Sequence, residues 1–311
     1  MKKDKYICEL CSSNEFEKII NYKFINEIFR DKYIVECKSC GIKSIYPNIH
    51  EEQLNNYNNN YYLNAHKDLK LDKLAETFFC NIAKCRFNFL EKFLKKEKLI
   101  IKNVLEIGPG RGHFYEQFAK NNNNVNYSIL ESDINYKKNF SKKNITIYEN
   151  FEEILKNDFD LIIFSHVLEH IMKPNNFLKK IYKILKTKGV IFLEVPCLDY
   201  LYKDIFEPHV FFYSKETLSL LLKKNNFQNH QIFYFGKNIS KLQSNKFYNK
   251  LKSKFLTILL KFNLTFMIKI KEENNYDFLD TKYEKIIADM YEMNSEHYKP
   301  SWWMRALIVK N

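Results

Sequence analysis

The sequence lacks both a long hydrophobic run and a signal peptide. No apolar stretch among the 311 residues reaches the roughly 18 that a transmembrane helix requires. The amino-terminal segment, MKKDKYICEL, is basic but carries no apolar run of the kind found in secretory signals. We therefore expect a cytoplasmic protein with no transmembrane segment. Hydrophobic residues make up 45% of the chain, which is enough to build a core and argues against wholesale disorder.

Acidic residues are fewer than basic ones. The chain has 37 Asp and Glu against 50 Lys and Arg, so its formal net charge is +13. A basic excess favours anionic partners such as nucleotide-linked substrates, nucleic acid or an acidic membrane surface. The same basic excess is also explained if the lysines serve only solubility in a proteome that is rich in Lys and Asn. The composition alone leaves both interpretations open.

Four of the seven cysteines form two CxxC pairs, Cys8 with Cys11 and Cys37 with Cys40. In a cytosolic protein such pairs indicate a metal site rather than disulfides, and neither pair opens a βαβ unit as a redox motif would. Four thiolates close the tetrahedral shell of Zn²⁺ and leave no position for catalysis, so the expected zinc ion is structural. The other cysteines are expected to be packing residues: Cys80, Cys85 and Cys197.

Apolar periodicity divides the chain into three parts, with no internal repeat. Residues 1–62 are expected to form a small zinc-binding head with a tyrosine-rich connector. Residues 63–235 are expected to form an α/β domain with an amino-terminal helix. Residues 236–311 are expected to be a helical insertion or lid that returns to a final strand at ALIVK.

The central part predicts alternating strands and helices. Helical spacing predicts helices over residues 66–98, 112–120 and 176–185, with Gly189 terminating the last. Short apolar runs predict strands at residues 103–107, 125–130, 145–148, 159–165 and 189–195. This order predicts an α/β fold with a Rossmann-like, doubly wound, mostly parallel sheet of seven strands. Ligands of such sheets bind beyond the carboxyl ends of the strands.

A glycine-rich turn, Gly108-Pro-Gly110-Arg-Gly112, directly follows the first of these strands. Glycines permit positive φ and let the backbone approach a ligand closely. The dinucleotide fingerprint G-x-G-x-x-G fails, because its third glycine would fall at His113. The spacing suits a ligand without a pyrophosphate, and Glu131, which ends the second strand, could accept hydrogen bonds from two ribose hydroxyls. A tight turn that binds nothing is the alternative.

Four segments in succession resemble the motifs of class I S-adenosylmethionine-dependent methyltransferases, over about residues 100–220. They read VLEIGPGRGHF, ILES, FDLIIFSHVLEHI and LKTKGVIFLEVP. The resemblance implies S-adenosylmethionine as the cofactor, with the glycine turn under its methionine part and the acid after the second strand on its ribose. It implies that the segment after the third strand contacts adenine, although Asn150 stands where Asp is commoner. The implied cofactor residues are Glu106, Gly108, Gly110, Glu131, Asn150, Phe151 and His166.

Residues 8–62 are similar to the zinc-ribbon head that precedes many bacterial methyltransferases acting on nucleotide sugars or surface-polysaccharide building blocks. The likeness includes the exit segment EEQLNNYNNNYY. It implies that the tyrosine segment covers the mouth of the active site, which makes Tyr61 and Tyr62 candidate substrate contacts. Aromatic side chains that fasten the head to the main domain are the alternative interpretation.

Two segments offer a histidine as general base for methyl transfer to an alcohol. His166 and His170 flank Val-Leu-Glu and would share one face of a helix start. The spacing also resembles a zinc-protease motif, which the preceding buried parallel strand argues against. His170 belongs to the family's HVLEH turn, where it serves either catalysis or the cofactor pocket. His209 follows the fifth strand and is expected to be the base, with Glu207 at the substrate; a histidine that caps the next helix is the alternative.

The leading functional hypothesis is an O-methyltransferase of an anionic small molecule, namely a nucleotide-linked or phosphorylated sugar used for surface glycan. The alternative is an RNA methyltransferase whose zinc ribbon binds RNA. Enzymes that methylate base nitrogens usually carry Asp or Asn followed by Pro-Pro and an aromatic after the fourth strand, whereas this chain reads Ser165-His166-Val167. Residues 247–270 mix Lys with apolar residues and could form a lid, a membrane-surface helix or the face of a homodimer.

Overall fold

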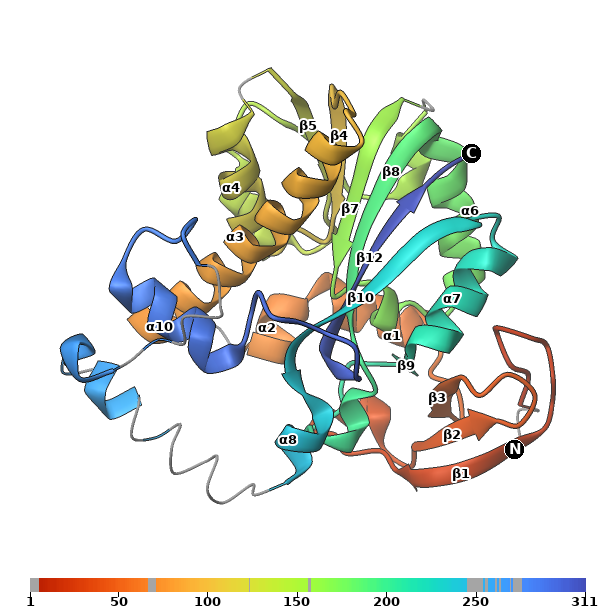
Figure 1. The fold of residues 1–311 in the computed structure, drawn as a ribbon. Coiled ribbons are helices and arrows are strands. Elements are labelled where there is room, and N and C mark those ends of the chain that lie inside the picture. The colour runs from red at the N-terminus through yellow and green to blue at the C-terminus, as the bar shows by residue number, and fades with distance from the viewer. Residues whose placement is uncertain are drawn as a thin grey trace.

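The computed structural model describes most of the chain. The described residues are 6–66, 71–122, 124–155, 158–244, 254, 257–260, 262, 264–268, 270 and 276–311. They form an eight-stranded sheet with the order β11-β10-β12-β8-β7-β4-β5-β6, and a four-stranded sheet with the order β1-β2-β3-β9 (Figure 1). The first is the α/β domain and the second belongs to the amino-terminal head.

Five parallel strands form the centre of the large sheet, as predicted. They are β4 (Asn103–Ile107), β5 (Asn126–Leu130), β6 (Thr146–Tyr148), β7 (Phe159–Ser165) and β8 (Leu185–Pro196). Most of their residues are buried because helices cover both faces, which explains why they read as continuous apolar runs. Short runs of this kind mark buried strands in α/β proteins, so the parallel core follows from the sequence.

Antiparallel strands complete one edge of this sheet. The strand β12 (Ser301–Val309) pairs with β8 and with β10 (Asn229–Asn238), so the predicted final strand lies inside the sheet. The sheet has eight strands and not the predicted seven, because the two-residue strand β11 (Glu296–His297) is added outside β10. The strand β10 also continues past the boundary predicted at residue 235.

Helices cover the two faces of the sheet with separate apolar layers (Figure 1). On one face lie α3 (Lys73–Lys96) and α4 (His113–Asn121), with α10 (Lys282–Tyr291) packed on α3. On the other lie α6 (Pro174–Ile184) and α7 (Lys215–Lys224). Side chains alternate along each strand. For example, Val104 packs in the layer of α3 and Leu105 in the layer of α6.

Two helix boundaries differ from the prediction. The helix predicted over residues 66–98 begins later: α2 (Tyr61–His66) ends at the first residue of that range, and α3 begins at Lys73, after Asp72, whose side chain accepts a hydrogen bond from the Ala75 N–H at 2.8 Å. Leu69, counted in the predicted helix, lies outside the described residues. Gly189 does not terminate a helix: α6 ends at Ile184 and β8 begins at the next residue, so Gly189 lies within the strand.

The head is built onto the α/β domain. Its strands β1 (Phe16–Asn21), β2 (Tyr33–Cys37) and β3 (Lys43–Tyr46) are joined by β9 (Phe211–Phe212), which follows the α/β domain's β8. The Ile45 N–H donates to the Val210 carbonyl at 3.0 Å. Buried residues of the head and of the α/β domain belong to one continuous apolar cluster.

Short helices connect the head to the α/β domain or follow β5 and β10. They are α1 (Glu51–Asn59), α2, α5 (Ile134–Lys137) and α8 (Ile239–Gln243). No helix among the described residues has both the length and the apolar character to span a bilayer. Much of the segment 247–270, proposed as a lid, membrane-surface helix or dimer face, lies outside the described residues.

Candidate active site

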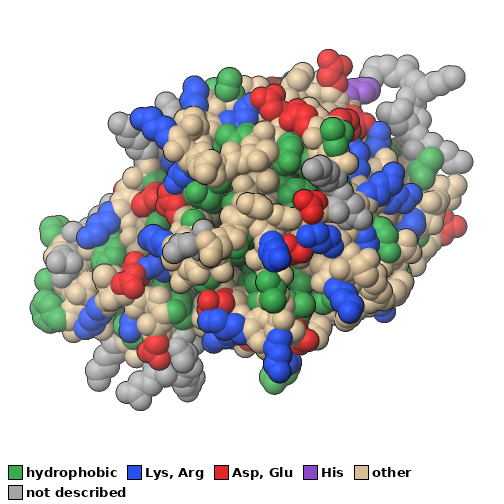
Figure 2. Space-filling view, turned by 90° about the horizontal axis from the view of Figure 1, so that it is seen from above, with side chains coloured by type: hydrophobic (Ala, Val, Ile, Leu, Met, Phe, Trp, Pro, Cys, Tyr) green, Lys and Arg blue, Asp and Glu red, His purple; other side chains and the backbone are tan. Residues whose placement is uncertain are grey.

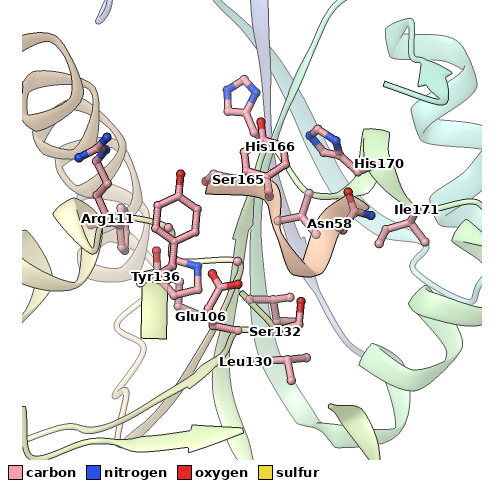
Figure 3. A pocket seen from close by; sticks show the side chains of 18 of the residues that line it. Asn58, Glu106, Arg111, Leu130, Ser132, Tyr136, Ser165, His166, His170 and Ile171 are labelled. Atoms are coloured by element: carbon pink, nitrogen blue, oxygen red, sulfur yellow. The ribbon is translucent and has the colours of Figure 1, made fainter. Parts of the chain in front are cut away.

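A cavity of about 720 Å³ opens at the carboxyl ends of the parallel strands (Figure 3). This volume is within the range of roughly 300–1,000 Å³ that small-molecule sites occupy. Residues that follow β4, β5, β6 and β7 line it, and α1 contributes Asn58 from the opposite side. The position beyond the strand ends is the one that a doubly wound sheet predicts for its ligand.

The glycine turn after β4 forms one wall of the cavity. Gly108, Gly110 and Gly112 all have positive φ, at 64°, 54° and 85°. A Cβ on Gly108 would lie 2.7 Å from Cγ2 of Val167, so no larger residue fits there without a shift. A Cβ on Gly110 would meet no atom within 4 Å, so the bare backbone at this position borders open space. The turn can therefore cradle a ligand against its backbone.

Two buried carboxylates lie beside this turn. Glu106 accepts a hydrogen bond from the Tyr127 hydroxyl at 2.7 Å, and Glu131 accepts one from the Asp133 N–H at 2.9 Å. Burial raises the pKa of each carboxyl group to about 7, despite these hydrogen bonds. Both residues line the cavity. Buried carboxylates are stabilised by donors, so the pair favours a ligand that brings hydroxyl or ammonium groups.

The segment after β6 supplies an apolar surface to the cavity. The Asn150 side chain accepts from the Glu152 N–H at 3.1 Å and donates to Glu153 at 2.7 Å, so it is committed to a local turn. The Phe151 ring packs edge-on against Phe177 at 5.6 Å. Both predicted residues line the cavity, but the aromatic ring and not the amide is available to a ligand.

His166 connects the cavity to a buried ionic cluster. Its Nδ1 lies 3.1 Å from Glu169 Oε1 and its Nε2 lies 3.3 Å from Glu194 Oε1. Burial lowers the pKa of His166, but the two carboxylates outweigh burial and raise it. Glu194 also accepts from Arg86 Nε at 2.9 Å and Arg305 Nε at 2.6 Å.

Sequence reasoning missed Arg86, Glu194 and Arg305. The two guanidinium groups hold the pKa of the fully buried Glu194 carboxyl well below its usual range, although burial alone would raise it. A glutamate in the middle of the apolar run GVIFLEV was the available signal, because a buried charge requires partners. The sequence did not identify those partners, since they come from α3 and β12.

The two histidines of the HVLEH segment do not share a helix face as predicted. Residues Leu168–His170 form a single 3-10 turn, and His166 precedes it with a φ of 57°. This left-handed residue turns the chain, so both imidazoles reach the same cavity from different directions (Figure 3). The zinc-protease geometry, which needs a regular helix, is therefore absent from this described segment.

His170 and His209 meet in a buried polar cluster. Their rings lie edge to face, with centroids 4.9 Å apart at 88°, and Tyr61 contacts His170 at 5.7 Å. His209 Nδ1 lies 2.8 Å from Asp199 Oδ2, which also lies 2.8 Å from Lys203 Nζ. Burial lowers the pKa of His170 to about 3, so this imidazole is neutral near pH 7.

Asp199 was not predicted from the sequence. Burial alone would raise its pKa, but His209 and Lys203 hold the pKa well below its usual value, so the carboxylate is ionised. It lies beyond the carboxyl end of β8, an edge where sites form in α/β sheets. His209 does not cap the following helix, because Ser214 is the amino-terminal cap of α7.

Of the three candidate substrate residues Tyr61, Tyr62 and Glu207, one lines the cavity and two do not. Tyr61 lines the cavity. Tyr62 is not among the lining residues: its N–H donates to Asp133 at 2.7 Å and its ring packs on Tyr136. Glu207 is also not among them, because its carboxylate accepts the backbone N–H groups of Ile25 and Asn26, both at 2.8 Å. Glu207 therefore fastens the head to the α/β domain.

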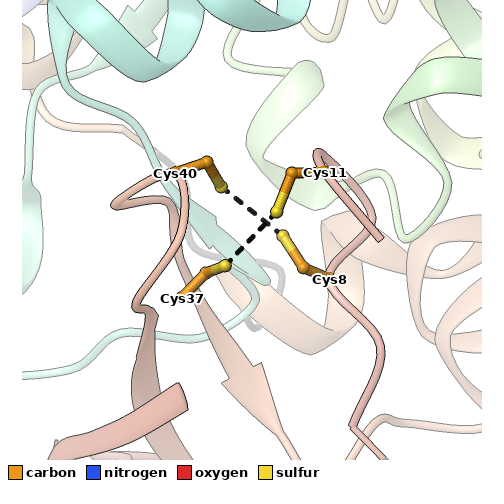
Figure 4. A group of neighbouring side chains, drawn as sticks. All are labelled: Cys8, Cys11, Cys37 and Cys40. Carbon is orange, nitrogen blue, oxygen red and sulfur yellow. Dashed lines mark hydrogen bonds between the residues drawn. The ribbon is translucent and has the colours of Figure 1, made fainter. Parts of the chain in front are cut away.

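The four cysteines of the head converge (Figure 4). The Sγ atoms of Cys8 and Cys40 are 3.6 Å apart, and those of Cys11 and Cys37 are 3.4 Å apart. A tetrahedral Zn²⁺ with bonds of about 2.3 Å separates its sulfur ligands by about 3.8 Å, close to these distances. The donor set and spacing therefore fit a structural zinc ion.

The two CxxC turns have the same backbone form. Ser12 and Gly41, each directly after the second cysteine of its pair, have φ of 65° and 73°. Their N–H groups donate to the carbonyls of Cys8 and Cys37, both at 2.8 Å. Gly41 was the signal visible in the sequence, whereas Ser12 adopts the equivalent conformation without glycine.

Comparison with known proteins gives one family match. Residues 77–232 match the family model described as "Methyltransferase domain". This range includes the glycine turn, Glu131, His170 and His209. No curated protein sequence matches the chain.

Several solved structures are similar to the chain at low identity. They include a SAM-dependent methyltransferase from Thermotoga maritima (15% identity, 73% of this chain, 91% of that chain, TM-score 0.43). Another, from Archaeoglobus fulgidus, has 18% identity, covers 72% of this chain and 94% of its own, and has a TM-score of 0.43. Phosphoethanolamine N-methyltransferase 2 of Haemonchus contortus has 15% identity over 81% of this chain and 60% of its own, with a TM-score of 0.46. These TM-scores add nothing to the family assignment.

The cysteine site predicts that Cys37→Ser lowers both the zinc content and the melting temperature. The binding energy of a structural zinc ion contributes to folding, so its loss destabilises the head. Zinc is measured by atomic emission after dialysis against a mild chelator, and melting by circular dichroism. Cys197→Ser, which changes a buried thiol outside the site, should retain the zinc. Wild-type protein without tightly bound zinc would contradict the assignment.

Proposed function

The chain belongs to the methyltransferase domain family, and from this premise we propose that it methylates a hydroxyl group of a nucleotide-linked or phosphorylated sugar. S-Adenosylmethionine is the proposed methyl donor, and the product a precursor of surface glycan. One observation carries the proposal: a single cavity joins a glycine turn with buried carboxylates to a histidine paired with an aspartate.

The cofactor is assigned to the end of the cavity that contains the glycine turn. Gly108 and Gly110 would lie against its methionine part, and Glu131 would accept the ribose hydroxyls. The open space at Gly110 and the raised pKa of Glu131 fit such a ligand. Phe151 offers its ring to the adenine. When bound, the sulfonium supplies an electrophilic methyl group on a neutral leaving group.

His209 is the proposed general base. Asp199 lies against its Nδ1, which leaves Nε2 as the nitrogen that takes the proton of the acceptor hydroxyl. The ionised aspartate fixes the ring and stabilises the imidazolium that forms. His170, which is neutral, packs at right angles to His209 and helps to hold the ring in place. Methyl transfer itself needs mainly alignment, so a rigid buried dyad suits the reaction.

The acceptor is assigned to the end of the cavity near the head. Tyr61 and the amides of Asn55 and Asn58 line this region, and they suit a polyhydroxylated molecule. Lys203, which pairs with Asp199 at 2.8 Å, also lines the cavity and brings a positive charge that suits a phosphate. On the face that Figure 2 shows, lysine and arginine side chains are interspersed with acidic and apolar ones.

Glu131 predicts a pH-dependent affinity for the demethylated cofactor, S-adenosylhomocysteine. Only the ionised carboxylate accepts from both ribose hydroxyls, and its pKa is raised to about 7. Ionisation increases as the pH rises, so affinity should increase about tenfold from pH 6 to pH 8. Calorimetry measures this, and Glu131→Gln should flatten the pH profile, whereas Glu91→Gln, at a residue that does not line the cavity, should leave it unchanged. An unchanged pH profile in Glu131→Gln would contradict the role.

The substrate class predicts where the methyl label goes. With radiolabelled S-adenosylmethionine, we expect label in a pool of nucleotide sugars and phosphorylated sugars, in a product stable to mild alkali as a methyl ether is. Total RNA is the matched competitor, tested over a range of salt because electrostatic RNA binding weakens steeply with salt. Label that enters RNA and not the sugar pool would contradict the proposal.

If His209 and Asp199 act together, the effects of substituting them on turnover should not be additive. His209→Ala should lower turnover of the identified acceptor by about 10²-fold or more and leave cofactor affinity unchanged. Asp199→Asn should lower turnover less, and adding it to His209→Ala should cost little more, because the two residues act as a unit. Single-turnover kinetics measure these effects. Turnover near wild type in His209→Ala would remove this residue from the mechanism.

A further inference from the structure

Another cluster of metal-ligand side chains adjoins the cavity, which one of its three members, His113, lines. Glu76 and Cys80 project from α3, and His113 is the first residue of α4. Cys80 Sγ lies 3.6 Å from His113 Nδ1 and 3.8 Å from Glu76 Oε1, and the latter two atoms are 3.7 Å apart. We propose that these three side chains bind a divalent transition metal ion of the zinc type.

The three distances match one tetrahedral ion. Typical bonds of about 2.3 Å to sulfur and about 2.0–2.2 Å to nitrogen or oxygen separate two ligands by about 3.4–3.6 Å. The observed separations exceed these values by only a few tenths of an ångström. The spacing of Glu76 and Cys80 by four residues puts both on one face of α3, facing α4.

The surroundings leave the three donors available to an ion. Lys84, four residues after Cys80 on α3, is paired with Asp280 at 2.7 Å and Glu284 at 3.0 Å, so its charge is compensated elsewhere. Cys80 and Glu76 are partly exposed, which gives an ion a route of entry. Cys80, predicted as a packing residue, is only partly buried, whereas Cys85 and Cys197 are fully buried.

The cluster differs in character from the four-cysteine site. Three protein ligands of mixed type leave a fourth position for water or another ligand, which four thiolates do not. His113 lines the cavity, directly follows Gly112 of the glycine turn and stacks on Phe79 with ring centroids 6.2 Å apart. An ion here would link α3 to the first turn of α4. Because His113 lines the cavity, metal binding would also affect the cavity wall.

Cobalt binding to the full-length protein tests this site. Co²⁺ is added after a mild chelator has removed weakly held ions, and equilibrium dialysis and absorption are recorded without cofactor or acceptor. Zinc held by the four cysteines is not displaced, because Zn²⁺ binds the same donors more tightly than Co²⁺. We expect one Co²⁺ per chain and a thiolate-to-cobalt charge-transfer band that Cys80→Ser abolishes. His113→Ala should weaken the affinity at least about tenfold.

Controls separate this site from the rest of the molecule. Glu91→Gln, on the same helix but outside the cluster, should bind Co²⁺ like the wild type, whereas Glu76→Gln should bind it more weakly. Circular dichroism verifies that each variant is folded. The absence of a Co²⁺ ion in wild type, or its persistence in the Cys80→Ser, His113→Ala double variant, would overturn the proposal. Because methyl transfer is not measured, these results do not depend on the proposed function.

Discussion

One buried carboxylate, that of Glu194, determines how the walls of the cavity meet. It lies near the carboxyl end of β8 with no exposure, and it is paired with Arg86 of α3, Arg305 of β12 and His166 after β7. An unpaired charge at this depth would cost several kcal/mol, so these segments are stable only in an arrangement that surrounds the carboxylate. The left-handed turn at His166, and with it the position of the HVLEH segment, follows from this requirement.

The two ends of the cavity come from different parts of the chain. The end where we propose the cofactor is made by turns that directly follow β4, β5 and β6, so each residue is positioned by the strand before it. The end where we propose the acceptor combines α1 and α2 of the head region with the segment around His209 and with Lys203. In this proposal the parallel sheet positions one ligand and the added segments position the second.

Sequence patterns correctly predicted the elements whose conformation depends on neighbouring residues. The parallel strands followed from apolar runs, and the glycine turn and the CxxC turns followed from spacing. Asp199, Arg86 and Arg305 were missed because their partners are distant in sequence, and Glu207 was assigned to the substrate because the backbone of the head that it binds was not visible in the sequence. The strand β8 was predicted to begin at residue 189 and begins at Leu185, because Gly189 suggested a helix terminator before the strand.

The two-residue strand β9 links the methyltransferase domain to the head. It follows His209 by one residue and is paired with β3, while Phe206 and Phe212 are buried against the head. Removing the amino-terminal segment would therefore expose a sheet edge and an aromatic patch beside His209. Such surfaces promote self-association. The methyltransferase domain is consequently not a detachable module, and a minimal catalytic fragment of this chain must begin upstream of its first cysteine.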